Sequence, residues 1–112
     1  MVQEYVNNPY LIDGLKFDMR IYVLVLSSDP LKIYMHEEGL VRFATKPYQP
    51  VNLRSDTENM KNMFVHLTNY ALNKENRDYR QAESISDNTG HKRSITSLMK
   101  HLEWDNKDVE TL

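Results

Sequence analysis

Lys16, Asp18 and Arg20 place a cation, an anion and a second cation at alternate positions of one segment. The run Lys16–Leu26 is rich in β-branched and aromatic residues and has no Gly or Pro, so it predicts a strand of about ten residues. Side chains alternate along a strand, so the three charged groups share one face. The other face carries the apolar residues Phe17, Met19, Ile21, Val23 and Val25.

Charged groups beside a core are costly to desolvate without partners. This pattern therefore favours a site for an anionic ligand, in which Lys16 and Arg20 hold phosphate or carboxylate oxygens. The alternative is the solvated first half of an edge strand, where Asp18 neutralises its neighbours. Arg42 stands alone among apolar residues, and it is either an edge arginine whose stem covers apolar surface or part of a functional site.

The segments around these residues predict a three-stranded antiparallel meander over residues 17–45. Leu31–His36 and Leu40–Thr45 are typical of strands. Short polar loops join consecutive strands, which favours antiparallel pairing. The second half of the first strand, up to Leu26, is apolar and is expected to be buried on both sides. Val2–Val6 is typical of the end of a strand, and Leu11–Gly14 of a turn in which Gly14 takes a positive φ.

The downstream half predicts short helices and loops. Ser55–Glu58 fits a capping box for a helix up to about Phe64. Val65–Lys74 is typical of a short strand entering a loop, and Glu75–Gly90 of a mobile loop. Ser94 can cap a last helix, and residues 103–112 are expected to be frayed. The apolar stripe of that helix consists of Ile95, Leu98, Met99 and Leu102.

Composition limits the class of protein. The 112 residues suffice for one domain, and a net charge of −2 with a pI near 6.1 argues against a dedicated nucleic-acid binder. The chain has no cysteine, so it has no disulfide or thiolate metal site, and its histidines lack metal-ligand spacing. No apolar run approaches the length of a membrane span, and the first residues do not form a secretory signal. The absence of a partner for the first strand and of a closing element at Leu112 suggests sequence missing at both ends.

The segments KFDMRIYVLVLSSDPLKIYMHEEGLVRFATKPY and HLTNYALNK resemble the tubulin tyrosine ligase-like family. The resemblance covers residues 2 to about 102, and HLTNYALNK and HKRS resemble its polyglutamylase branch. It implies an α+β fold of the ATP-grasp type, built from an antiparallel meander and short helices. The chain would then be the central part of the domain, over residues 1–112, incomplete at both ends.

The function that this resemblance implies is ATP-dependent ligation. L-glutamate would be added to glutamate side chains of tubulin tails through an acyl phosphate, in the cytoplasm and on the cytoskeleton, including the cilium or flagellar basal body. Tubulin or microtubules and L-glutamate are the implied partners, with no nucleic acid and no membrane span. The implied cofactors are ATP and Mg²⁺, and the Mg²⁺ ligands are expected outside this chain, so the chain alone is expected to be inactive. Because the sheet would lack its covering lobe, apolar surface of Val23, Val25 and Phe43 is expected to be exposed in this chain by itself. A non-catalytic remnant that binds nucleotide or tubulin is the alternative.

The family's functional positions carry over to this chain one by one. By this resemblance, ATP-binding positions are Gln3, Glu4, Tyr5 and Val6 on the adenine strand, then Lys16 and Asp18, and later Thr68 and Asn69. Arg20 and Arg42 match the catalytic pair that holds the transferring phosphate and the amino-acid carboxylate. Arg42, Tyr70 or its neighbour, and Lys92 match positions near the incoming glutamate. His91 departs from the small residue expected there.

Overall fold

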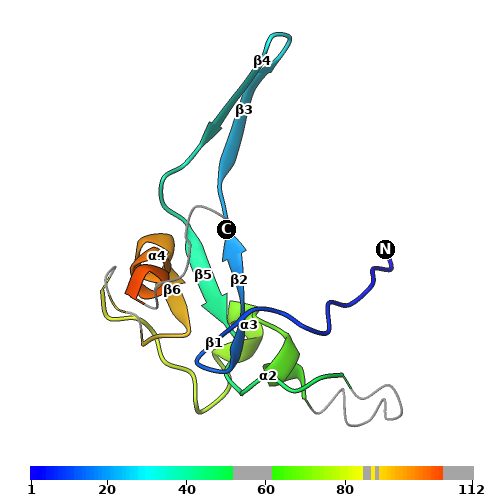
Figure 1. Ribbon diagram of the computed structural model, residues 1–112, viewed down its shortest axis with the longest axis vertical. Coiled ribbons are helices and arrows are strands. Elements are labelled where there is room, and N and C mark those ends of the chain that lie inside the picture. The colour runs from blue at the N-terminus through cyan, green and yellow to red at the C-terminus, as the bar shows by residue number, and fades with distance from the viewer. Residues whose placement is uncertain (52–61, 85–86, 88, 105–112) are drawn as a thin grey trace. The chain divides into compact units, whose positions relative to one another are not determined.

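In the computed structural model (Figure 1), the described residues are 1–51, 62–84, 87 and 89–104. The strands are β1 Leu11–Ile12, β2 Leu15–Arg20, β3 Val23–Ser28, β4 Leu31–Met35, β5 Leu40–Phe43 and β6 Lys92–Ser94. The helices are α2 Met63–His66, α3 Tyr70–Asn73 and α4 Ile95–Trp104. The antiparallel pairs and short helices make an α+β fold, as predicted. Unit 1 comprises Met1–Phe17 with Phe43–Tyr79, and unit 2 comprises Asp18–Arg42 with Arg80–Leu112; each is described by itself.

In unit 1, a two-residue turn joins β1 to β2. Asp13 and Gly14 have φ values of 53° and 73°, which is the backbone of the tight hairpin turns that favour Asp-Gly. The pairing places Leu11 opposite Lys16 and Ile12 opposite Leu15. The predicted positive φ of Gly14 is confirmed, but Leu11–Ile12 belongs to a strand and not to the turn.

Apolar burial in unit 1 centres on Phe43, which is 1% exposed. Its ring lies 5.5 Å from that of Phe17, and Ile12, Ala44 and Val65 are also buried. The Ala44 N–H donates to the Lys16 carbonyl over 2.8 Å, which ties the end of β5 to the start of β2. The expectation that Phe43 would be left exposed in this chain is therefore wrong.

The predicted strand at Val65–Lys74 is wrong, because α2 and α3 occupy most of this segment. The buried side chain of Asn73 explains why. Its amide nitrogen donates to the Leu67 and Asn69 carbonyls, and its amide oxygen accepts from the Thr45 hydroxyl. These bonds satisfy carbonyl groups of a turn that strand pairing would otherwise have to satisfy. The capping box at Ser55–Glu58 lies outside the described residues, and α2 continues to His66.

The predicted strand at Val2–Val6 is also wrong. Residues 1–10 contain no strand, and Val2 and Val6 are exposed. A strand needs a neighbour for its backbone groups. This segment is held instead by single bonds, such as the one from the Tyr48 hydroxyl to the Asn7 carbonyl, 2.8 Å long.

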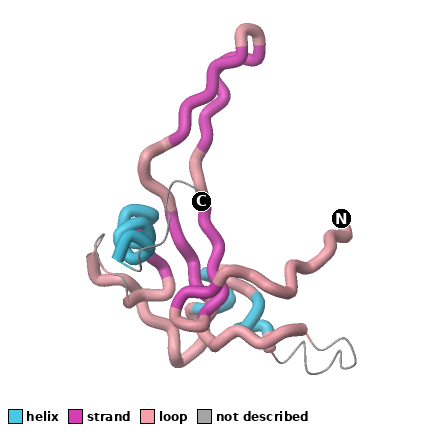
Figure 2. Tube along the Cα trace, in the orientation of Figure 1, coloured by secondary structure: helices cyan, strands magenta, loops and turns pink. Residues whose placement is uncertain are grey.

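In unit 2, β3 and β4 form an antiparallel hairpin (Figures 1 and 2), with Val23 opposite Met35 and Val25 opposite Ile33. The single long strand predicted over Lys16–Leu26 is wrong, because it is interrupted at Ile21–Tyr22. The expected burial of its second half is also wrong, since Val23 and Leu24 are 55% and 60% exposed. The separate expectation, that Val23 and Val25 are exposed when the sheet lacks its covering lobe, is confirmed.

The predicted meander is wrong as well, because β4 pairs with β3 in a separate sheet whereas β5 lies between β2 and β6. Gly39 gives the physical reason. A Cβ on Gly39 would lie 2.4 Å from the Arg20 carbonyl oxygen and 2.6 Å from a carbon of Ile95. The turn after β4 is therefore pressed against Arg20 and the start of α4, and the strand partners change there.

The last helix follows the prediction closely. The Ser97 N–H donates to the Ser94 hydroxyl over 3.0 Å, so Ser94 caps α4 as expected. Leu98 and Leu102 of the apolar stripe are each 2% exposed. Glu103 and Trp104 are still helical, so the prediction that the chain is frayed from residue 103 is wrong at these two residues. The described residues between 75 and 90 include no helix or strand, which confirms a loop there.

Candidate functional site

The Asp18 carboxylate and the Arg42 guanidinium form a two-pronged ion pair in unit 2. Arg42 Nε donates to Asp18 Oδ1 over 3.0 Å, and Nη2 donates to Oδ2. The Arg42 side chain is 21% exposed and the Asp18 side chain is 37% exposed. The bond to Asp18 raises the pKa of Arg42 against the opposing effect of burial. Such a pair fixes the plane of the guanidinium as well as its position.

Arg42 is not an edge arginine, because β5 has a neighbour on each side. Within unit 2, Lys92 on β6 lies directly opposite Arg42, so their side chains share a face of the sheet. Asp18 bonds to Arg42 from β2, and Arg20 lies two residues further along the same strand face. We call Asp18, Arg20, Arg42 and Lys92 the charged row.

Two arginines of the charged row, Arg20 and Arg42, offer N–H donors beyond those that Asp18 accepts, so the row suits an anionic ligand. A guanidinium carries five N–H donors, and Asp18 takes two of those on Arg42. Arg20 is exposed and forms no ion pair or side-chain hydrogen bond with another described residue. Carboxylate or phosphate oxygens fit the remaining donors.

A second cluster lies in unit 1 around Lys16. Its ammonium donates to the Tyr5 hydroxyl over 3.2 Å and to the His66 carbonyl over 3.0 Å, and it lies 4.6 Å from the centre of the Tyr5 ring. The Tyr5 oxygen is 2.9 Å from His66 Nδ1. The rings of Tyr5 and Tyr48 each meet that of His66 edge to face, with centres 5.7 Å apart. We call Tyr5, Lys16, Tyr48 and His66 the lysine cluster.

Chemistry fixes the direction of one bond in the lysine cluster. An ammonium only donates, so the Tyr5 oxygen accepts from Lys16, whereas the direction of the bond between Tyr5 and His66 Nδ1 depends on the tautomer of His66. Burial and the nearby Lys16 charge lower the pKa of His66, which favours the neutral ring. Burial raises the pKa of Tyr48, so its hydroxyl keeps its proton.

The structure brings some predicted residues together and leaves others apart. Asp18, Arg42 and Lys92 meet in unit 2, whereas Tyr5 and Lys16 meet in unit 1. The strand assignment of positions 16, 18 and 20 is confirmed by β2. The remaining predicted ATP-binding residues are exposed or half-buried: Gln3, Glu4, Val6, Thr68 and Asn69.

Tyr70 and His91 make local contacts. The Tyr70 ring lies 5.8 Å from that of Tyr79 and 5.7 Å from the Lys74 ammonium. His91 Nδ1 accepts from the Arg80 N–H over 2.9 Å, while the His91 N–H donates to the Arg80 carbonyl. These two bonds hold the end of the loop to Arg80. They give a structural reason for His91 at a position where a small residue was expected.

Sequence reasoning missed Tyr48 and Glu38, and it gave His66 only a structural role. Tyr48 lies in a proline-containing loop, where no periodic pattern marks an inward-facing side chain. Glu38 belongs to a predicted turn, but its carboxylate binds the start of α4. A carboxylate that caps a helix 57 residues later in the chain leaves no local signal.

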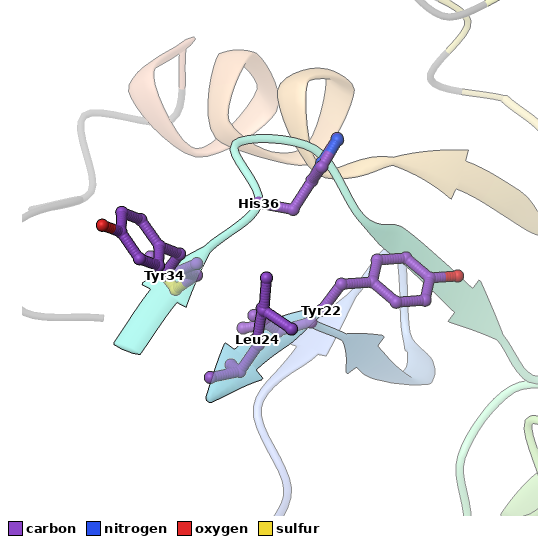
Figure 3. A pocket seen from close by; sticks show the side chains of 7 residues that line it. Tyr22, Leu24, Tyr34 and His36 are labelled. Atoms are coloured by element: carbon purple, nitrogen blue, oxygen red, sulfur yellow. The ribbon is translucent and has the colours of Figure 1, made fainter. Parts of the chain in front are cut away.

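An apolar hollow of about 550 Å³ lies beside the hairpin (Figure 3). Tyr22, Leu24, Tyr34 and His36 line it, together with neighbouring residues of the two chain segments. Its mainly hydrocarbon walls are unsuited to a phosphate or carboxylate, which the charged row suits better. Among the described residues, no group of three or more His, Cys, Asp or Glu side chains is placed to hold a metal ion. None of the described helices has the length and apolar character needed to cross a membrane.

Comparison with known proteins identifies one family over nearly the whole chain. Residues 1–111 match the tubulin-tyrosine ligase family. A probable beta-tubulin polyglutamylase of Tetrahymena thermophila is 50% identical over 113 aligned positions, which cover 100% of this chain and 9% of the relative.

Two mammalian proteins are similar to this chain at a comparable level of identity. The tubulin polyglutamylase TTLL5 of Mus musculus is 44% identical over 100% of this chain and 8% of its own length. The tubulin polyglutamylase TTLL7 of Homo sapiens is 44% identical over 97% of this chain and 12% of its own length. The chain thus spans about a tenth of the length of these relatives.

Proposed function

Because the chain belongs to the tubulin-tyrosine ligase family, we propose that it is part of an ATP-dependent ligase that adds L-glutamate to glutamate side chains of tubulin. The observation that carries this proposal is the 50% identity to a probable beta-tubulin polyglutamylase over the whole chain. The ATP-grasp fold is part of the same proposal, as are the cytoplasm, the cytoskeleton and the cilium or basal body as its locations.

The proposed reaction joins two carboxylate-bearing partners. ATP supplies the phosphoryl group that converts the tubulin side-chain carboxylate into an acyl phosphate. The amine of L-glutamate then attacks the acyl carbon, the amide bond forms and phosphate leaves. Both substrates and the leaving phosphate are anionic, so catalysis depends on fixed cations that hold them in reach of one another.

The charged row supplies such cations. Arg42, held in its plane by Asp18, would bind the carboxylate of the incoming glutamate through its remaining N–H groups. Arg20 would hold the transferring phosphate, and Lys92 would add charge beside Arg42. This assignment agrees with the N–H donors that Arg20 and Arg42 keep beyond the bonds to Asp18.

The lysine cluster fits a nucleotide. Lys16 uses two of its three N–H donors on Tyr5 and His66, which leaves one for a phosphate oxygen. The exposed segment Gln3–Val6 offers backbone groups and the Tyr5 ring for a base. The described residues do not fit Mg²⁺, because no carboxylate cluster is present among them. We therefore place the magnesium ligands elsewhere in the longer protein and derive no step from them.

The test is a chimera, since activity needs the longer protein. The Tetrahymena relative would carry residues 1–112 in place of its matching segment and would be incubated with tubulin, ATP, Mg²⁺ and labelled L-glutamate. Mass spectrometry of the tubulin tails should show added glutamate. Arg42→Ala should abolish it, whereas Arg77→Ala, at an exposed cation, should not.

Two results would contradict the proposal. A folded chimera without activity would reject ligation by this segment, and nucleotide or tubulin binding by that chimera would favour the non-catalytic alternative. Addition of an amino acid other than glutamate would reject the substrate assignment.

A further inference from the structure

Glu38 links the turn between β4 and β5 to the start of α4 through one carboxylate. Its Oε1 accepts from the Ile95 N–H over 2.8 Å, from the Thr96 N–H over 3.3 Å and from the Gly39 N–H over 3.0 Å. Its Oε2 accepts from the Thr96 hydroxyl over 2.7 Å. The first N–H groups of a helix lack partners within the helix, and a negative charge there is favourable. Glu38 therefore supplies a cap to α4 from the turn between β4 and β5.

The residues on either side of this contact carry the cations of the charged row. β5 begins at Leu40, two residues after Glu38, and continues to Arg42. β6 ends at Ser94, directly before Ile95, and places Lys92 opposite Arg42. Ile95 N–H also donates to the Gly39 carbonyl over 3.2 Å. The Glu38 carboxylate thus joins the residue directly before β5 to the residues directly after β6.

Arg20 depends on the same junction. A Cβ on Gly39 would approach the Arg20 carbonyl oxygen to 2.4 Å, so the backbone of the turn is in close contact with the end of β2. A displacement of the turn would move all three strands that carry cations.

We propose that Glu38 is a positioning residue for the charged row, which sets the spacing between Arg42 and Lys92 by joining the β4–β5 turn to the start of α4. This inference rests on the proposed function, in which the row binds L-glutamate. Glu38 itself does not touch the substrate; it acts through the strands that it connects.

The test replaces Glu38 by Gln in the Tetrahymena chimera. Gln keeps the size of the side chain but loses the charge and one acceptor oxygen. The apparent KM for L-glutamate should rise about fivefold, because the cations that bind its carboxylate lose their spacing, while kcat stays within about twofold. Thr96→Val, which removes one bond to the carboxylate, should give a smaller rise. Glu37→Gln, at the exposed neighbouring carboxylate, is the matched control and should leave KM unchanged.

Amide hydrogen exchange separates this inference from the proposed function. In Glu38→Gln, exchange should become faster at Ile95 and Thr96 and also along Leu40–Arg42 and Lys92–Ser94. Faster exchange at the helix start alone, or an unchanged KM in an active chimera, would reduce Glu38 to a helix cap and overturn the inference. If the unmodified chimera adds no glutamate, the proposed function fails, and the exchange along β5 and β6 still decides whether Glu38 positions the row.

Discussion

Arg42 donates two N–H groups to Asp18, and we propose that its other N–H groups bind a ligand. The sequence pattern placed Asp18 and Arg20 on one strand face, and the structure bears this out through β2. The Asp18–Arg42 pair could not be predicted in this way, because the two residues lie 24 positions apart and the predicted meander did not specify their register.

Replacement of Arg42 by Lys keeps the charge but removes the planar fork. Each charge-assisted bond contributes roughly 1.5–3 kcal/mol, so the variant should lose about ten- to a hundredfold in kcat/KM. In the chimera, the loss should appear as a raised KM for L-glutamate, with that for ATP nearly unchanged. Arg77→Lys at an exposed position serves as the control.

Unchanged kinetics of Arg42→Lys would mean that the arginine only pairs with Asp18. A selective loss of ATP affinity would instead move Arg42 to the phosphate. Folding should be affected slightly, because the Asp18 carboxylate is 37% exposed and water can solvate it when the fork is lost.

Protonation of His66 should destabilise the chain. Its pKa in the folded state is lowered by burial and by Lys16, so the unfolded state binds the proton more tightly. The contribution to stability is complete above the unfolded pKa of about 6.5 and is lost as the pH falls through the folded pKa. NMR titration of the His66 ring should give a pKa below 6.5. A value above 6.5 would show that burial and the Lys16 charge do not disfavour the protonated ring.

At the level of elements, the sequence correctly predicted those features that depend only on residues close together in the chain. The Ser94 cap, the apolar stripe of α4 and the positive φ of Gly14 each depend on a few adjacent residues. The predictions were wrong where contacts with residues far away in the sequence determine the structure. Lys16–Leu26 has the composition of one strand, but the turn at Gly39 lies against Arg20 and divides the pairing between two sheets. Val65–Lys74 turns into helices because Asn73 binds carbonyls of its own segment and Thr45.

Alanine at the two turn glycines should separate backbone strain from steric exclusion. Gly14 has a φ of 73° with open space around a Cβ, so Gly14→Ala should lower the free energy of unfolding by about 1 kcal/mol. Gly39→Ala would press a methyl group against the Arg20 carbonyl and should cost more, about 1–3 kcal/mol. Urea titration of the two variants measures both. Equal losses would indicate that the chain around Gly39 can shift to make room.

At the scale of the whole chain, the described residues of unit 1 contain the lysine cluster and those of unit 2 the charged row, but none of the described residues form a metal cluster. The chain also spans about a tenth of its relatives' length. We therefore expect the purified 112-residue chain to add no glutamate to tubulin in the presence of ATP and Mg²⁺. Mass spectrometry of the tubulin tails checks this. Modified tubulin would show that the cations described above suffice without further residues, and that the magnesium ligands have been placed wrongly.

The hairpin of β3 and β4 gives the chain a second property. Its two faces are apolar and exposed, with Leu24 at 60% and Ile33 at 53%. Exposed apolar strands favour association between chains. The purified chain should therefore sediment faster as its concentration rises.

A double substitution to Thr at the cross-strand pair Val25 and Ile33 tests this expectation. It keeps the β-branched shape of both side chains but adds hydroxyl groups, so association should shift to higher concentration. Ser28→Thr, at an exposed position of the same hairpin, is the matched control. Sedimentation that does not depend on concentration, or equal association of the Thr variant, would show that the hairpin is not the surface through which chains meet.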